Sequence, residues 1–140
     1  YLHWGHDMSP EENQYEAGLK FAISFKKNID FVGKKAIEKI KNKKIKKMMA
    51  MLTLKNNKPG SPLLLHDEPI YCDGKIVGRT TSGNYSFNYE KNISFGYLNL
   101  VSPIEELAKK TFFIEIEKKK YEAILQTKPL HDPENKIIKS

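Results

Sequence analysis

The sequence predicts a mainly β protein of the α+β class, with an antiparallel β-barrel of about six strands preceded by an arm, a strand and a short helix. Short apolar or alternating segments recur through the second part of the chain and are separated by turn residues. The dipeptide Asp73-Gly74 between two such segments is typical of a tight hairpin. Farther along, Phe112, Ile114 and Ile116 alternate with other side chains, which indicates a strand with one buried face.

The part of the chain before the predicted barrel has weaker patterns. Residues 1–15 mix Pro, Asn, His and acidic side chains without sustained periodicity, so we expect an extended arm and loop. Apolar side chains alternate with smaller ones in residues 20–26, which predicts a strand. Asp30 stands where a helix N-cap would be, and a helix is predicted over residues 33–42.

Residues 47–127 contain the strands of the expected antiparallel barrel or sandwich. An apolar run at residues 48–54 is short enough for a buried strand, and a loop with Pro59-Gly60 at its turn follows. Residues 103–110 are expected to form a turn or short helix. The remaining strands are predicted at residues 70–72, 75–77, 79–86, 93–98, 111–117 and 121–126.

The composition excludes several classes of protein. The chain has 140 residues, of which 39% are hydrophobic and 29% charged, as is typical of a globular domain with one core and not of a disordered chain. No apolar run approaches the roughly 20 residues needed to cross a bilayer, so we expect no membrane partner. The single cysteine, Cys72, excludes an internal disulfide, and we interpret it as a small apolar strand residue.

The formal net charge of +7 comes from one segment. Residues 34–47 contain eight lysines against one acid, Glu38, while the rest of the chain is balanced. Three interpretations stay open: a solvated helix face, a site for an anionic part of a ligand, and a nucleic-acid surface. The aromatic residues lie in the predicted strands and are not interleaved with these lysines, so nucleic acid is the least favoured partner.

Glu16 is the candidate binding residue. It is followed by the small and apolar residues 17–19, and a carboxylate in such a setting is costly unless donors satisfy both oxygens. Glu16 therefore needs a ligand or a structural partner, and the plain alternative is that it caps a turn or pairs with a lysine. No metal site is predicted, because His3 and His6 have no third ligand close in sequence. No nucleophile elbow or glycine-rich phosphate loop is present, so no residue is predicted to be catalytic.

Five motifs recur in an order known from one family. They are Y-x-x-W-G-x-D at residues 1–7, E-A-G-L at 16–19, D-F-V-G-K at 30–34, G-K-I-V-G at 74–78 and T-T-S-G at 80–83. In this order and spacing, the chain resembles the folate-binding aminomethyltransferase family, which includes the T-protein of the glycine cleavage system. The sequences F-G-Y at residues 95–97 and K-P-L-H-D-P at 128–133 look closest to the C-terminal part of dimethylglycine and sarcosine dehydrogenases.

The resemblance implies the end of a three-lobed enzyme. Residues 1–46 would be the end of the aminomethyltransferase folate-binding domain, and residues 47–140 the C-terminal antiparallel barrel domain. Because the chain starts with Tyr1 inside a motif, we expect a piece of a longer enzyme whose remaining N-terminal lobes are its partner. That parent would be an aminomethyltransferase or N-methyl amino acid dehydrogenase, cytoplasmic in a bacterium or mitochondrial in a eukaryote.

The resemblance also implies the ligand and its site. Tetrahydrofolate would be the cofactor, receiving a one-carbon unit to give methylenetetrahydrofolate, and FAD would be bound only by a missing N-terminal half. Glu16 is implied to bind the pterin ring. Tyr1 and Tyr71 are chosen as aromatic walls and Lys47 as the partner of the anionic folate tail, whereas Tyr97 is interpreted as a packing residue.

Other functions stay open. The chain could belong to a glycine cleavage T-protein or another folate-dependent demethylase, to a non-catalytic regulatory relative, or to a basic nucleic-acid-binding module. It departs from the family pattern where Gln14 and Tyr15 precede the glutamate, and where lysines at residues 43–47 stand in place of an expected arginine. A lysine binds an anion as a point charge without the two-pronged geometry of arginine.

Overall fold

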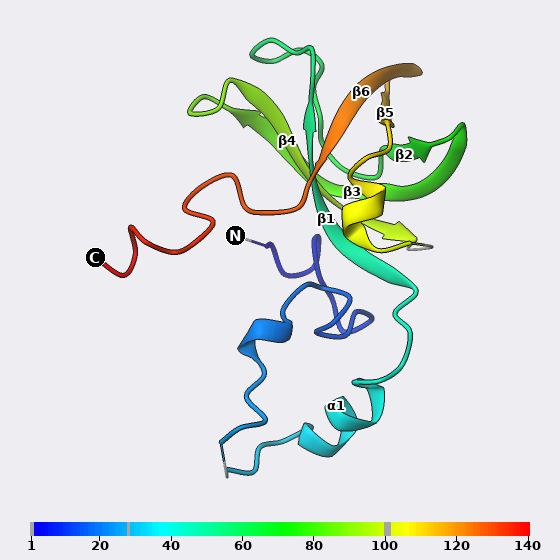
Figure 1. Ribbon diagram of the computed structural model, residues 1–140. Coiled ribbons are helices and arrows are strands. Elements are labelled where there is room, and N and C mark those ends of the chain that lie inside the picture. The colour runs from blue at the N-terminus through cyan, green and yellow to red at the C-terminus, as the bar shows by residue number, and fades with distance from the viewer. Residues whose placement is uncertain (1, 28, 100–101) are drawn as a thin grey trace.

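A closed β-barrel dominates the computed structural model, which describes residues 2–27, 29–99 and 102–140 (Figure 1). Six antiparallel strands follow one another around the barrel in the order β1-β4-β3-β2-β5-β6. The prediction of a mainly β fold with about six barrel strands is confirmed. The sandwich alternative is excluded, because β1 pairs with both β4 and β6 and closes the sheet. The strands are β1 (Lys47–Leu54), β2 (Pro69–Cys72), β3 (Lys75–Ser86), β4 (Lys91–Asn99), β5 (Phe112–Ile116) and β6 (Lys119–Gln126).

The interior of the barrel is filled by every second side chain of its strands. In β5 the predicted alternation is confirmed: Phe112, Ile114 and Ile116 are buried, while the residues between them are partly exposed. Burying such a side chain is worth roughly 1.5–3 kcal/mol. Cys72 is 5% exposed within the same core, which confirms its interpretation as a small apolar strand residue. Other core members are Leu52, Leu54, Leu64, Ile70, Leu98 and Leu125.

The predicted hairpin between β2 and β3 is confirmed. Asp73 and Gly74 both have positive φ, 51° and 75°, as a two-residue type I′ turn requires. The loop around Pro59-Gly60 is also confirmed, since Lys58 and Ser61 exchange two backbone hydrogen bonds of 2.9 and 3.0 Å across it. These turns depend on local residue chemistry, and the sequence could therefore predict them.

One long strand replaces two predicted ones. Residues 75–77 and 79–86 belong to the single strand β3, which shifts register against β4 between Thr80 and Ser82. Such an irregularity bends a strand and lets it follow a strongly curved barrel wall. The short helix expected near residues 103–110 is present as α2 (Ile104–Leu107).

The strand predicted over residues 20–26 is absent. A 3₁₀ helix, η1 (Lys20–Ala22), and irregular backbone take its place, and Phe21 is 85% exposed. A strand needs a neighbouring strand for its backbone hydrogen bonds, and no described residue supplies one here. The alternation of apolar and smaller side chains was therefore not enough to predict a strand.

The predicted helix before the barrel is shorter than expected. It is α1 (Lys34–Ile40), and its N-cap is Gly33 at φ 89°, without a capping side chain. Asp30 is not the cap: the N-cap is Gly33, and within the described residues the Asp30 carboxylate accepts from the backbone N–H of Phe31, which precedes the helix. Figure 1 shows residues 2–27 and 29–46 on one side of the barrel, with α1 separated from it. None of the helices in the described ranges is long and apolar enough to span a membrane.

Candidate functional site

The carboxylate of Asp7 fastens the N-terminal arm to the barrel. It is 2% exposed; its Oδ1 accepts hydrogen bonds from Thr81 Oγ1 (2.5 Å) and Ser82 Oγ (2.7 Å), and its Oδ2 accepts from the His3 backbone N–H (2.8 Å). Burial raises the pKa of Asp7, but the hydrogen bonds from Thr81, His3 and Ser82 outweigh it and hold the pKa below the ordinary value of 3.8. Two motifs that lie 74 residues apart are thus joined in one contact.

Glu12 and Lys47 make a second connection between arm and barrel. Lys47 Nζ lies 2.6 Å from Glu12 Oε1, while Glu12 Oε2 accepts from the backbone N–H (2.9 Å) and hydroxyl (2.7 Å) of Ser9. Burial opposes the charge of Glu12, but the hydrogen bonds from Lys47 and Ser9 lower its pKa. Lys47 Nζ also lies 4.9 Å from the ring centroid of Tyr97 on β4, within cation–π range. Lys47 therefore already has two partners.

Glu16 is held by its backbone and leaves its carboxylate largely unsatisfied. Its carbonyl oxygen accepts from the Met49 N–H at 2.7 Å. Pairing of β1 with β6 begins only at Met51, so the arm occupies the free edge of β1 at this point. Within the described ranges, the Glu16 carboxylate accepts a single hydrogen bond, from the Asn13 N–H to Oε2 at 3.3 Å. A carboxylate has about four acceptor positions, so most of this capacity is open to a ligand.

Tyr97 lies on the other side of Met49 from Glu16. It is directly opposite Met49 in the β1–β4 pair, and its hydroxyl oxygen is buried without a hydrogen-bond partner among the residues described. Burial and then the charges of Glu12, Asp7 and Glu16 raise the pKa of Tyr97 to about 12. The phenol therefore stays protonated at neutral pH and remains a donor. A buried donor left unsatisfied costs about 1–3 kcal/mol, which favours an occupant that accepts from it.

A polar cavity of about 480 Å³ opens beside Tyr97, between the arm and the outer faces of β3 and β4. Its wall contains the Lys47–Glu12 pair and a second pair in which Arg79 Nη1 lies 3.0 Å from Asp67 Oδ1. Glu16 is not among its lining residues and lies beyond Tyr97, at the free edge of β1. The cavity thus contains two ion pairs, the carboxylate of Glu11 and the aromatic ring of Tyr97.

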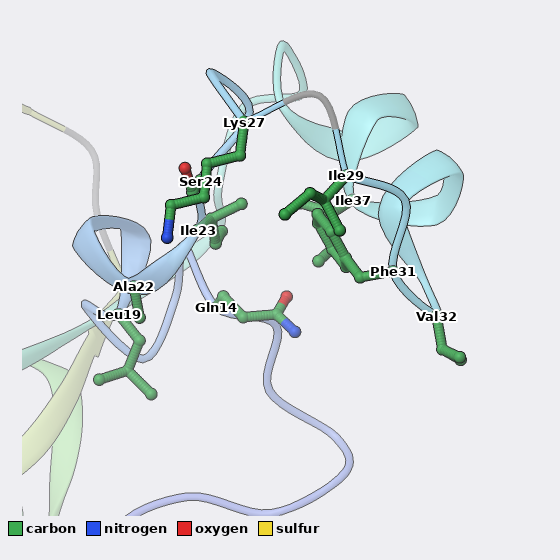
Figure 2. A pocket seen from close by; sticks show the side chains of 10 residues that line it. All are labelled: Gln14, Leu19, Ala22, Ile23, Ser24, Lys27, Ile29, Phe31, Val32 and Ile37. Atoms are coloured by element: carbon green, nitrogen blue, oxygen red, sulfur yellow. The ribbon is translucent and has the colours of Figure 1, made fainter.

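A second hollow, of about 430 Å³, lies within the arm and the segment before α1 (Figure 2). In Figure 2, Ile29, Phe31 and Ile37 gather on one side of it, whereas Val32 points away. Its other lining residues are Gln14, Leu19, Ala22, Ile23, Ser24 and Lys27. No carboxylate lines it, so it fits an apolar surface and not the chemistry predicted from Glu16.

The described part of the chain offers no metal centre, since no group of three His, Cys, Asp or Glu side chains is placed to hold an ion. Of the lysines in residues 34–47, Lys47 alone forms an ion pair within the described ranges. The other lysines of this run are not assigned a function by their contacts.

Residues 47–132 match the family described as the glycine cleavage T-protein C-terminal barrel domain. The chain belongs to this family. Human mitochondrial dimethylglycine dehydrogenase is 34% identical over 127 residues, which cover 91% of this chain and 14% of that protein. The 4-methylaminobutanoate oxidase (formaldehyde-forming) of Paenarthrobacter nicotinovorans is 30% identical over 139 residues, 99% of this chain and 16% of that protein. The chain therefore spans 14 to 16% of the length of these relatives.

The fold of this T-protein barrel chain is also seen in a solved structure. The crystal structure of the glycine cleavage system aminomethyltransferase T from Bartonella henselae matches 95% of this chain and 36% of that chain, with a TM-score of 0.76 and 19% identity. At this identity the match shows the fold alone. Together with the family match and the curated relatives, it confirms the resemblance that the motifs indicated.

The predicted site residues of this T-protein family member fall in different places. Glu16 and Lys47 lie close together, where the arm meets β1. Tyr71 lies on β2, which is opposite β1 in the strand order, and Lys120 Nζ covers its ring at 3.7 Å from the centroid. The structure therefore does not bring Tyr71 to Glu16. Tyr1 lies outside the described residues, so its predicted role stays a prediction.

The sequence did not reveal one contact of Asp7, and it gave Tyr97 no binding role. Asp7 was noticed as part of a motif but not as the partner of Thr81 and Ser82. Tyr97 was interpreted as a packing residue, and that stays a prediction; in the structure Lys47 Nζ lies 4.9 Å from the centroid of its ring. The motifs themselves were the available signal for Asp7, whereas the position of Tyr97 depends on the register of β1 against β4, which the sequence does not reveal.

Proposed function

We propose that this chain is the tetrahydrofolate-binding C-terminal portion of an aminomethyltransferase-like enzyme of the dimethylglycine or sarcosine dehydrogenase type. The family match supports the aminomethyltransferase part of this proposal. Dimethylglycine and 4-methylaminobutanoate, the compounds named in two relatives, both carry N-methyl groups, which supports an N-methylated amine as the source of the one-carbon unit. Oxidation of that amine by FAD is assigned to another part of the complete enzyme.

The proposal depends on how many hydrogen bonds each of three carboxylates in the arm accepts. Asp7 and Glu12 each accept three hydrogen bonds from the protein, and each is fully used in holding the arm. Glu16 accepts one long hydrogen bond, although the next residue, Ala17, is 5% exposed. A ligand with two adjacent N–H groups would satisfy such a carboxylate in the way a guanidinium does. The 2-amino and N3–H groups of a pterin have this geometry.

The residues present fit a bound folate and suggest what each would do. When bound, tetrahydrofolate supplies the nitrogen nucleophile that takes up the one-carbon unit. Glu16 would hold the edge of the pterin ring, and Asp7 would keep the arm in place on β3. The outer wall of the barrel would exclude water from one side. This contribution is orientation and not proton transfer, and we assign no general acid or base to the chain.

Titration of tetrahydrofolate into the complete gene product tests the proposal. Glu16→Gln is expected to weaken binding by about 1–3 kcal/mol, because the amide cannot accept two charge-assisted hydrogen bonds. Glu105→Gln on the exposed surface of α2 is the matched control and should leave the affinity unchanged. Equal affinity in the wild type and Glu16→Gln would remove Glu16 from the site, and a wild type that binds no folate would reject the function.

The type of enzyme is tested by its product and its absorption spectrum. The dehydrogenase type is expected to show flavin absorption and to form methylenetetrahydrofolate from dimethylglycine or sarcosine when tetrahydrofolate is present. A flavin-free protein that transfers an aminomethyl carbon would instead be a T-protein. A folded protein without turnover or folate binding would be a regulatory relative.

A further inference from the structure

Two contacts from the start of β1 hold the short loop of residues 12–16, which we call the Glu16 loop. Lys47 Nζ lies 2.6 Å from Glu12 Oε1 at the beginning of this loop. The Met49 N–H donates to the Glu16 carbonyl oxygen at 2.7 Å at its end. Lys47 and Met49 are two residues apart on one strand, so β1 holds the loop at both ends.

Hydrogen bonds inside the Glu16 loop connect these two contacts. The side-chain oxygen of Asn13 accepts from the backbone N–H groups of Tyr15 (3.0 Å) and Glu16 (3.1 Å). The Asn13 N–H donates to Glu16 Oε2 at 3.3 Å. Glu12 directly precedes Asn13 in the chain, so a displacement of Glu12 moves the residue that orients the Glu16 carboxylate.

The side chain of Glu12 is fixed well enough to transmit the position of Lys47. It is 10% exposed, against 33% for the side chain of Lys47. Glu12 Oε2 accepts from the backbone N–H (2.9 Å) and the hydroxyl (2.7 Å) of Ser9, so both carboxylate oxygens are engaged. Hydrogen bonds to a charged group are roughly twice as strong as those between neutral groups. The ion pair is therefore a firm link between strand and loop.

The charge of Lys47 is already used inside the protein. Its Nζ pairs with Glu12 and lies 4.9 Å from the centroid of the Tyr97 ring. Burial opposes the charge of Glu12, but the hydrogen bonds from Lys47 and Ser9 lower its pKa, so this carboxylate is ionised at neutral pH. An anionic ligand group that approached Lys47 would meet a neutral pair and not a free cation.

We propose that Lys47 is a positioning residue of the folate site, which sets the place of the Glu16 carboxylate through its ion pair with Glu12. This inference rests on the proposed function. It differs from the role that the sequence predicted for Lys47, a direct contact with the anionic folate tail. A positioning lysine affects every ligand that carries the pterin ring, whereas a tail-binding lysine affects only ligands that carry the tail.

The test compares tetrahydrofolate with 6-methyltetrahydropterin, which has the same ring edge but no glutamate tail. Both are titrated calorimetrically into the complete gene product as wild type and as Lys47→Met. Loss of the ion pair is expected to weaken the binding of both compounds by about fivefold. A loss confined to tetrahydrofolate would show a contact with the tail and would overturn the proposal.

Glu12→Gln is a second variant, in which Lys47 is retained. The amide has no charge to pair with the ammonium group, so we expect the binding of both compounds to weaken by about threefold. A lysine that binds the tail would instead be released from its partner by this change. Unchanged or tighter binding of tetrahydrofolate in Glu12→Gln would therefore overturn the proposal.

A double variant distinguishes positioning from a general loss of stability. If Lys47 acts through Glu16, Lys47→Met should weaken tetrahydrofolate binding by less than about twofold in the Glu16→Gln background, because coupled residues are not additive. A general loss of stability does not depend on the Glu16 carboxylate. The full effect of Lys47→Met in the Glu16→Gln background would overturn the proposal.

Lys55→Met is the matched control for the loss of a lysine. Lys55 follows the far end of β1 and forms an ion pair with Glu122 on β6. Its replacement should leave both affinities unchanged. An equal loss of affinity in Lys55→Met and Lys47→Met would show an effect without relation to the Glu16 loop and would overturn the proposal.

The wild type and Glu16→Gln separate this inference from the proposed function. A wild type that binds neither compound would reject the proposed function and this inference with it. Binding that is weakened by Glu16→Gln but unchanged in Lys47→Met would support the proposed function and overturn this inference alone. If Lys47→Met does not fold, Glu12→Gln decides the question.

Discussion

Replacing Asp7 with asparagine is expected to release the arm while the barrel stays folded. The side chain of Asp7 is the only described carboxylate that receives hydrogen bonds from the two hydroxyls of Thr81 and Ser82. The barrel core lies on the other face of β3 and contains no arm residue. The change should therefore act on the contact between arm and barrel and leave the core packing unaltered.

The size of the effect follows from the geometry of the three hydrogen bonds. Asp7 Oδ1 receives two hydroxyls at 2.5 and 2.7 Å, and Oδ2 receives the His3 amide at 2.8 Å. Asparagine keeps one oxygen and puts an NH₂ group opposite donors at the other position. Hydroxyls can rotate to accept, but a backbone N–H cannot. At roughly 1.5–3 kcal/mol for each hydrogen bond to a charged group, we expect arm docking to weaken by about 2–4 kcal/mol.

Amide hydrogen exchange of residues 2–20 measures this loss directly. Exchange in the arm should accelerate by the factor that corresponds to the lost free energy, while barrel amides such as that of Leu52 keep their protection. Asp132→Asn is the control, because Asp132 also accepts from backbone amides, those of Lys136, Ile137 and Ile138, but in the exposed C-terminal tail. Unchanged arm exchange in Asp7→Asn would refute the reasoning.

Two further predictions concern pH and the strand contact behind the site. The pKa of Asp7 is lowered in the folded chain, so its stabilisation is complete above its ordinary pKa of 3.8 and is lost as the pH falls below that through the folded-state value. Protection factors of the arm amides should fall over this acid range in the wild type, and should fall less in Asp7→Asn, where the Glu12 contacts remain to titrate. Gly78→Ala should lower the free energy of unfolding by about 3 kcal/mol, because a Cβ there would meet the backbone oxygen of Tyr97 at 1.9 Å and push β3 from β4. Thermal unfolding compared with Ser86→Ala, at the end of β3, checks it, and equal stability of the two variants would contradict it.

The exposed apolar residues of the arm bear on the complete enzyme. Phe21 is 85% and Val32 103% exposed, and Val32 is one of the residues that line the hollow in Figure 2. Apolar surface of this kind is typical of an interface. We propose that another lobe of the same enzyme covers it, in keeping with the expectation that N-terminal lobes are its partner.

The local sequence determined most of the barrel strands and the Asp73-Gly74 hairpin. Strand alternation and turn chemistry act between near neighbours, so the buried face of β5 and the positive φ of Asp73 could be predicted. The motif around Glu16 likewise marked a carboxylate without an evident partner. In the structure the Glu16 carboxylate accepts one hydrogen bond within the described ranges, which agrees with that expectation. The ligand of Glu16 stays a proposal.

Tertiary structure alone decided which distant residues meet. The alternating residues 20–26 form no strand because no other described segment pairs with them, and hydrogen bonding to a partner strand is a long-range requirement. The register of β1 against β4 places Tyr97 opposite Met49, and barrel closure places Tyr71 on the far wall from Glu16. A shift of one residue would turn Tyr97 to the other face of the sheet, so its place beside the arm acids could only come from the folded chain.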